Sequence, residues 1–142
     1  MTLKQLSVFI ENRKGRLAEV LNILKEHNVN ILSMSLADTT EYGLLRLIVN
    51  DPETGCRVLL DAGFSSMLTD VLIIKIPHVA GSLQSILARI TEGGVNIEYM
   101  YGLSVETSDA SIVMKTNELE VACRVLREAG IATMTTEEIR AL

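Results

Sequence analysis

The sequence predicts an α+β protein made of two tandem ferredoxin-like β-α-β-β-α-β repeats, each an antiparallel sheet with helices on one face. Three observations predict this fold. The two halves of the 142-residue chain resemble each other, strand and helix periodicities follow the same order in both, and turn residues occupy matching places. We expect residues 1–69 to form the first repeat and residues 70–142 the second.

The duplication is clearest in the second predicted helix of each half. Residues 56–63 read CRVLLDAG and residues 123–130 read CRVLREAG, so six of eight positions are identical at an offset of 67. At an offset of 66, the letters Val-Asn-Ile recur at residues 29–31 and 95–97. Because the matches fall at corresponding places in both halves, they indicate a duplicated structural unit.

The first strand and first helix of each half follow from apolar periodicity. Alternation over residues 6–10 predicts a strand, and the more continuous apolar run at residues 72–76 predicts its buried counterpart. Apolar residues spaced i, i+3, i+4 and i+7 predict helices starting near Leu17 and Leu83. Asn28 and Gly94 follow these helices, and both residue types tolerate the left-handed conformation that ends a helix.

Two strands, a second helix and a last strand complete each half. The expected strands are residues 29–37, 44–50 and 64–68, then 95–105, 110–115 and 131–135. Polar hairpin connections are expected at residues 38–41 and 106–109, and a short connection containing Asp70 between the halves. The second helices are expected to open at Asp51-Pro52 and Asn117 and to end at Gly63 and Gly130. A closing helix capped by Thr136 is expected at residues 136–142.

Composition argues against several classes of protein. Apolar residues make up 48% of the chain and charged residues 22%, which argues against disorder. The net charge of −5 and the scattered Lys and Arg argue against nucleic-acid and membrane partners. The sequence shows no signal peptide or membrane-spanning run, and its two cysteines lack metal-site spacing. We therefore expect a cytoplasmic protein with no metal and no cofactor.

The order of elements, a polar loop ending in Gly-x-Leu before the first helix, and an Asn-Ile pair opening the second strand resemble the ACT domain. Two copies would cover essentially the whole chain. The resemblance implies a regulatory module that binds a free amino acid as effector and controls a metabolic enzyme or transcription. It also implies that modules pair side by side, with ligands at the interface between them. A homodimer is compatible with it.

The closest local match is the loop of residues 11–17, which resembles the family's Asn-Arg-Pro-Gly-x-Leu loop. Lys14 and Ala80 stand where the family has proline, and His78 takes the place of Asn12. The resemblance implies ligand contacts from both loops and from the strand openings. These residues are Asn12, Arg13, Lys14, Gly15, Arg16, Leu17, Asn30 and Ile31 in the first repeat, and His78, Val79, Ala80, Gly81, Ser82, Leu83, Asn96 and Ile97 in the second.

Elementary chemistry supports such a site. Glycine lets the backbone approach a ligand, and the free N–H groups of a helix start favour a carboxylate. The side-chain carbonyls of Asn30 and Asn96 could accept from an ammonium group. We expect the ligand at the junction of the two repeats.

Structural roles remain open for the same residues. Asn12 is also a good helix cap, His78 is also consistent with a solvated loop residue, and the two strand-opening asparagines could bond a turn. The basic cluster at residues 13–16 could be a solvated loop. Cys56 and Cys123 are expected as core thiols, and Tyr99 and Tyr101 as packing residues of one strand.

Three other functions are compatible with a small α+β protein to different degrees. An enzyme is disfavoured, since no nucleophile-base set, phosphate loop or metal cluster is recognisable and no catalytic residue is assigned, although a pair of carboxylates is not excluded. RNA binding is disfavoured because aromatic residues are only 4% of an acidic chain. The serious alternative is a ligand-free interaction subunit that regulates an enzyme.

Overall fold

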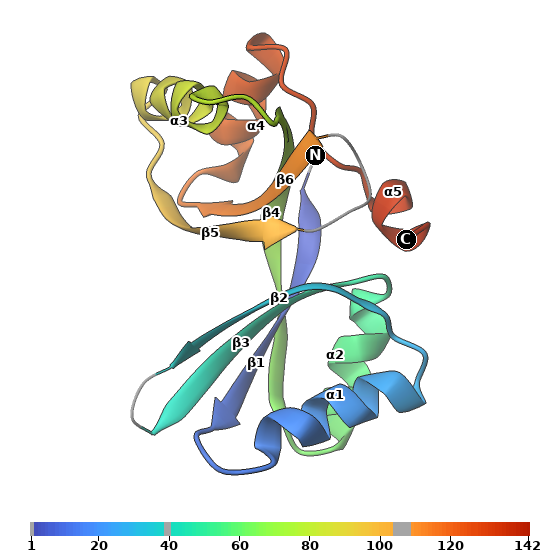
Figure 1. The fold of residues 1–142 in the computed structure, drawn as a ribbon. Helices are drawn as coiled ribbons and strands as arrows, with labels where there is room; N and C mark the ends of the chain where they lie inside the picture. The colour runs from blue at the N-terminus through green and yellow to red at the C-terminus, as the bar shows by residue number, and fades with distance from the viewer. Residues whose placement is uncertain (1, 39–40, 104–108) are drawn as a thin grey trace. The chain divides into compact units, whose positions relative to one another are not determined.

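The computed structural model describes residues 2–38, 41–103 and 109–142 (Figure 1). The elements of these residues are β1 (Leu3–Glu11), α1 (Arg16–Glu26), β2 (Ile31–Asp38), β3 (Tyr42–Val49), α2 (Pro52–Asp61), β4 (Ser65–Pro77), α3 (Ser82–Glu92), β5 (Ile97–Leu103), β6 (Asp109–Thr116), α4 (Leu119–Glu128) and α5 (Thr136–Arg140).

The chain divides into two compact units. The first unit comprises Lys4–Thr69 together with Ile139–Leu142, and the second comprises Asp70–Glu138 together with the start of the chain through Leu3. The strand order is β2-β3-β1-β4 in the first unit and β4-β6-β5 in the second, so β4 contributes its two ends to different units.

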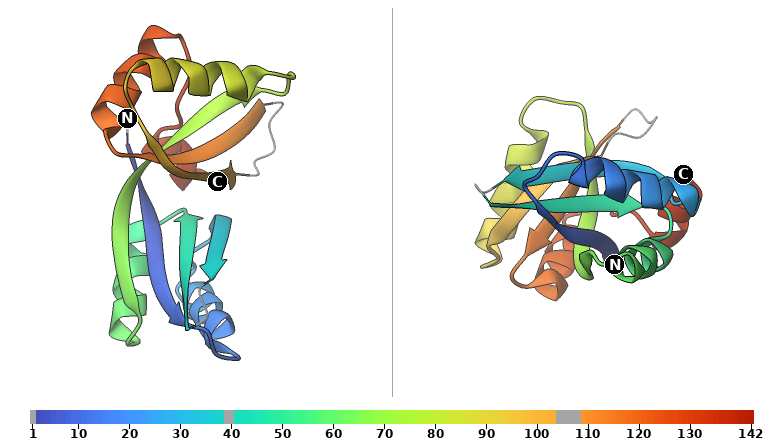
Figure 2. Two further views of the ribbon diagram at one scale, coloured as in Figure 1. Left: turned by 90° about the vertical axis from the view of Figure 1, so that its left-hand side faces the viewer. Right: turned by 90° about the horizontal axis from the view of Figure 1, so that it is seen from below.

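Antiparallel pairing sets the register of each sheet. In the first unit, Leu47 of β3 lies between Leu6 of β1 and Met34 of β2. In the second unit, Met114 of β6 lies between Leu72 of β4 and Met100 of β5. The views in Figures 1 and 2 show α1 and α2 on one face of the first unit's strands and α3 and α4 on one face of the second unit's. This architecture confirms the predicted fold class.

Each unit has its own apolar core. Leu6, Val8 and Ile10 alternate along β1 and pack in one core cluster with Val20 and Leu24 of α1. The second core repeats this pattern with Leu72, Ile74, Ile76, Ile86 and Ile90. Fully burying such a side chain stabilises the fold by roughly 1.5–3 kcal/mol. These apolar residues, which predicted the strands and helices by their spacing, therefore face the cores.

The ends of the helices follow the predicted turn residues. Asn28 after α1 has a φ of 57° and Gly94 after α3 has a φ of 80°, which confirms the expected left-handed helix ends. The carboxylate of Asp51 accepts a hydrogen bond from the Thr54 amide at 3.3 Å, so Asp51 caps α2 as predicted.

The predicted break between two strands is wrong, and one predicted strand does not form. Residues 65–68 and 72–76 belong to one continuous strand, β4, and Asp70 lies inside it instead of in a connection. Neither proline nor glycine interrupts β4 before its end at Pro77, so nothing in its sequence forces a break. Residues 131–135 form only one bridge, between Thr133 and Ile74, although two backbone hydrogen bonds of 2.9 and 2.8 Å flank it.

Several element boundaries also differ from the predictions. The strands expected from residues 29 and 95 begin at Ile31 and Ile97. Residues 39–40 and 104–108 lie outside the described residues, so half of the first hairpin connection, most of the second, and the end of the strand expected at residues 95–105 are not described. Asn117 does not cap α4, which begins at Leu119 with Glu118 as its N-cap residue.

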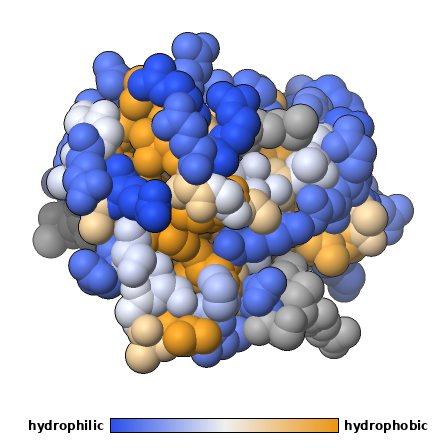
Figure 3. Space-filling model, turned by 90° about the horizontal axis from the view of Figure 1, so that it is seen from above, coloured by the Kyte–Doolittle hydropathy of each residue, from blue (hydrophilic) through white to orange (hydrophobic). Residues whose placement is uncertain are grey.

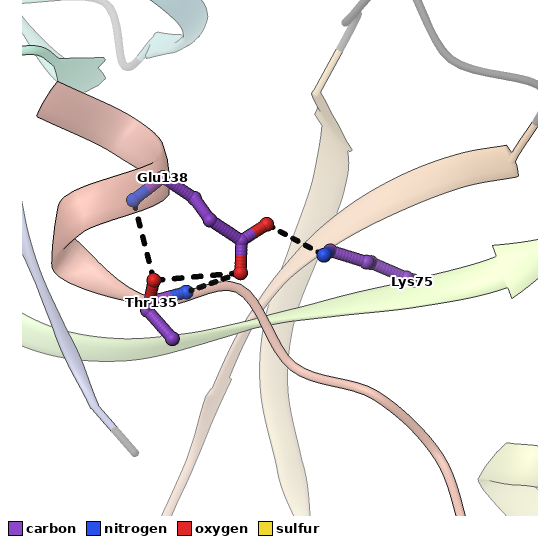
Figure 4. A network of polar contacts seen from close by, with 3 residues as sticks. All are labelled: Lys75, Thr135 and Glu138. Carbon is purple, nitrogen blue, oxygen red and sulfur yellow. Dashed lines mark hydrogen bonds and ion pairs between the residues drawn. The ribbon is translucent and has the colours of Figure 1, made fainter. Parts of the chain in front are cut away.

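The closing helix α5 ends at Arg140 and is capped by Thr135, not by Thr136 as predicted. The Thr135 hydroxyl accepts from the Glu138 amide at 3.2 Å, and the Glu138 carboxylate accepts from the Thr135 amide at 3.4 Å. This reciprocal pair is a capping box. The other carboxylate oxygen of Glu138 accepts from Lys75 of β4 (Figure 4). The hydrogen bond from Lys75 is the main reason that the pKa of Glu138 lies below its ordinary value.

The surface is mixed in character. Figure 3 shows apolar residues in patches among hydrophilic ones on the face seen from above. On the first unit's strands, Phe9, Met34 and Leu36 remain 49%, 43% and 49% exposed. Within the described ranges, no helix is long and apolar enough to cross a membrane.

Candidate functional site

The loops before α1 and α3 have the same backbone structure. Gly15 and Gly81 are the N-cap residues, with left-handed φ angles of 88° and 86°. A Cβ added at either glycine would meet no atom within 4 Å, so the backbone conformation, not crowding, requires glycine here. Neither helix has a side-chain cap, which removes the alternative that Asn12 caps α1.

Matching hydrogen bonds hold the two loops. The Arg13 amide donates to the Glu11 carbonyl at 2.7 Å, and the Val79 amide donates to the Pro77 carbonyl at 2.8 Å. The first N–H groups of a helix have no partner inside the helix, so both loops present a helix start to their surroundings. Such a start favours a carboxylate or another anion.

The cleft beside the first loop is small. It has a volume of about 90 Å³ and is lined by Ile10, Glu11, Asn12, Arg13, Leu17, Leu36 and Gly43. Of the predicted site residues in this loop, Asn12, Arg13 and Leu17 line it, whereas Lys14, Gly15 and Arg16 do not. The Arg16 guanidinium pairs with Glu19 at 2.7 Å and lies 4.3 Å from the centre of the Phe64 ring. Arg16 is thus engaged in packing against its own unit.

The cleft beside the second loop is much larger, with a volume of about 770 Å³. It runs from the loop along α3, and Ala110 of β6 lines it as well. Its lining residues are Ile76, Pro77, His78, Val79, Gly81, Ser82, Leu83, Gln84, Leu87, Ala88, Thr91 and Ala110. All predicted contacts of this loop except Ala80 line it, and the lining includes no Asp, Glu, Lys or Arg.

The strand-opening asparagines do not share a cleft with the loop of their own unit. An 11-residue helix separates Gly15 from Asn30, a rise of about 16 Å. Asn30 and Ile31 line a separate cavity of about 430 Å³ with Leu21, Lys25, Asn28 and Val29. The corresponding Asn96 and Ile97 are absent from the second loop's cleft.

Two further asparagines, which the sequence analysis missed, pair with these strand openings. The side-chain oxygen of Asn50 accepts from the Asn30 amide at 2.8 Å, and that of Asn117 accepts from the Asn96 amide at 3.0 Å. In return, the Asn50 amide donates to the Asn30 carbonyl at 3.1 Å, and the Asn117 amide donates to the Asn96 carbonyl at 3.2 Å. Asn50 and Asn117 are related by the offset of 67, so the repeat itself carried the signal.

Comparison with known proteins identifies the family. The family model described as "ACT domain pair" matches residues 1–142. The chain belongs to the ACT domain pair family. The resemblance inferred from the loop and the element order is therefore confirmed. None of the curated proteins searched matches this chain.

Solved structures show the same fold for this ACT domain pair. Protein BT0572 from Bacteroides thetaiotaomicron is 34% identical, with a TM-score of 0.94 over 100% of this chain and 98% of that one. The ligand-free regulatory subunit of aspartate kinase from Thermus thermophilus is 16% identical, with a TM-score of 0.63 over 89% and 91%. The corresponding subunit from Thermus flavus is 18% identical, with a TM-score of 0.62 over the same shares.

The remaining candidates of the ACT domain pair have packing roles. Cys56 and Cys123 are partly buried against the two cores, as predicted, and burial raises the pKa of the Cys56 thiol. Tyr99 and Tyr101 alternate along β5, opposite Lys115 and Val113 of β6, and are partly buried. Within the described ranges, no three His, Cys, Asp or Glu residues are grouped so that they could hold a metal ion.

Proposed function

We propose that this ACT domain pair is a cytoplasmic regulatory protein, not a catalyst, that binds a free amino acid and acts on a metabolic enzyme. The cleft at the second glycine loop is the observation that carries the proposal. Its volume of about 770 Å³ lies within the roughly 300–1,000 Å³ that is usual for small-molecule sites.

The cleft offers groups suited to an amino acid. The N–H groups at the start of α3 favour the carboxylate, and His78 and Ser82 add polar side chains beside them. The apolar stretch from Leu83 to Leu87 and Ala110 can enclose a side chain. The earlier expectation that Asn30 and Asn96 help to form the site at a junction of repeats stays a prediction.

An enzyme partner is proposed from the structural relatives. Two of them are regulatory subunits of aspartate kinase, which are similar to this chain over most of both chains. A subunit of this kind transmits ligand binding only if the ligand prefers one conformation or assembly over another. We expect the same requirement for this protein and its partner enzyme.

One observation favours a second candidate function. The exposed apolar residues Phe9 and Tyr42, on the face of the first unit's strands that does not face its core, suit a protein contact, either with a partner or in a homodimer. A ligand-free interaction subunit would use this surface and would leave the cleft beside α3 without a role.

A thermal-unfolding screen against the twenty amino acids separates these two functions. A ligand at about one hundred times its dissociation constant adds roughly 2.7 kcal/mol to stability, which raises the melting temperature by several degrees. A selective rise that is lost in His78→Ala or Ser82→Ala, but kept in the matched first-loop variant Asn12→Ala, supports the sensor at the second loop. If no amino acid raises the melting temperature, the interaction subunit becomes the better account.

A further inference from the structure

The two loops hold equivalent places in the repeats and share their backbone conformation, yet their clefts differ in volume, from about 90 Å³ to about 770 Å³. The loop backbones do not explain the difference, because Gly15 and Gly81 have nearly the same φ and both precede helices of 11 residues. The strands form the other wall of each cleft, so we compare their residues for the cause of the difference in volume.

The sheet registers show which wall residues correspond. Leu36 of β2 lies opposite Leu45 of β3, which lies opposite Val8 of β1. The same row of the second unit consists of Gly102, Ile112 and Ile74. Since Val8 and Ile74 are related by the offset of 66, Gly102 holds the place that Leu36 holds in the first unit.

Leu36 occupies space that Gly102 leaves empty. The Leu36 side chain lines the first cleft, and its Cδ1 lies 3.2 Å from the point that a Cβ on Gly43 would reach. At Gly102, an added Cβ would meet no atom within 4 Å. Leu36 thus narrows the first cleft, whereas the second unit has no side chain at the equivalent position.

The lining of the second cleft also restricts the ligand. Ile76, Leu83, Leu87 and Ala110 supply apolar atoms, and the side chains that line the cleft carry no fixed charge. Burying an aliphatic group there is favourable by about 0.8 kcal/mol for each CH₂ removed from water. An ionised side chain would gain no opposite charge from this lining.

We propose that the second unit's cleft, kept open by Gly102, is the chain's binding site for an amino acid with an aliphatic side chain. The first unit's cleft, narrowed by Leu36, does not bind one. This inference rests on the proposed function, because it assigns the ligand class and the stoichiometry of that same site.

Isothermal titration of the full chain tests the inference with leucine, isoleucine, valine and methionine as probes and aspartate and lysine as charged comparators. We expect one site per chain for at least one aliphatic probe and no measurable binding of either charged one. Gly102→Leu should weaken binding by more than about tenfold. This variant gives the second unit the leucine that narrows the first unit's cleft at the equivalent position 36. The matched variant Leu36→Gly should leave the affinity of the second cleft within about twofold.

A second variant guards against loss of folding in Gly102→Leu. Ala88→Leu narrows the same cleft from α3 with a strong helix former, so it should also weaken binding while circular dichroism stays native. If no amino acid binds the unaltered protein, the proposed function fails and this inference falls with it. Three results would overturn only this inference, while leaving the proposed function in place. They are two binding sites per chain, a preference for charged amino acids, and an unchanged affinity in the folded variants Gly102→Leu and Ala88→Leu.

Discussion

Gly15 and Gly102 form a matched pair of positions that separates backbone strain from steric crowding. A Cβ added at either glycine meets no atom within 4 Å, so alanine fits both spaces. Their backbones differ, because Gly15 has a φ of 88° whereas Gly102 does not have a positive φ. Alanine at position 15 must hold a left-handed conformation that costs an L residue about 1–2 kcal/mol.

A second effect acts equally at both positions. Alanine restricts the unfolded chain more than glycine does, which stabilises the folded state by about 0.4–1 kcal/mol where the native backbone suits it. We therefore expect Gly15→Ala to lower the free energy of unfolding by about 1 kcal/mol, and Gly102→Ala to raise it by about 0.4–1 kcal/mol.

Urea unfolding followed by circular dichroism measures both changes, without added ligand. Opposite signs in the two variants are the expected result. Two changes of the same sign and similar size would refute the reasoning, because they would mean that the left-handed backbone before α1 is not needed for the fold.

Three further predictions concern stability. Asn50→Ala and Asn117→Ala should each lower the free energy of unfolding by about 0.5–1.5 kcal/mol, since each removes the acceptor of a strand-opening amide; a loss in only one would show that the repeats do not use this bond alike. Leu24→Ala, at a fully buried position, should cost about 2–5 kcal/mol in urea unfolding, and a loss below 1 kcal/mol would contradict the assigned core. Because its folded pKa is lowered, Glu138 stabilises α5 above the ordinary pKa of a glutamate and loses this effect as pH falls through the lowered value. The protection of α5 against hydrogen exchange, relative to the intrinsic exchange rate at each pH, should therefore fall in acid, but not in Glu138→Gln or Lys75→Met. Equal acid sensitivity of this protection in all three proteins would disprove the link.

Much of the fold could be predicted because it depends on local periodicity repeated twice. The stripe of Leu17, Val20, Leu21 and Leu24 recurs in the second half, and all of its members except Leu21 pack in or against a core. The glycine loops were found in the same way, since their backbone conformation is a local property of the chain. Duplication doubled the evidence for each of these features.

Other features could not be predicted, because they depend on contacts between distant segments. The continuity of β4 past Asp70 depends on its strand partners, since local signals allowed a turn there. Thr135 and Thr136 were equally suitable caps by sequence, and the reciprocal bonds with Glu138 decided between them. The Asn50–Asn30 bond joins the ends of two different strands.

The candidate site shows the same limit. The sequence pointed to the first loop, whose Asn12 matches the family better than His78 does. The geometry instead favours the second loop, because the cleft there is wider. The offset of 66 pairs Leu36 with Gly102 in the sequence, but only the strand register shows that they hold the same place in the two sheets, in rows with Val8 and Ile74.

The central claim, that the second loop and its cleft bind an amino acid, is tested most directly by NMR on the unaltered protein. Backbone amide resonances would be followed during titration with the amino acid that raises the melting temperature most. The account predicts saturable shifts at Gly81, Ser82 and Leu83, with the corresponding Gly15, Arg16 and Leu17 unmoved. Shifts confined to the first loop, or none from any amino acid, would contradict it.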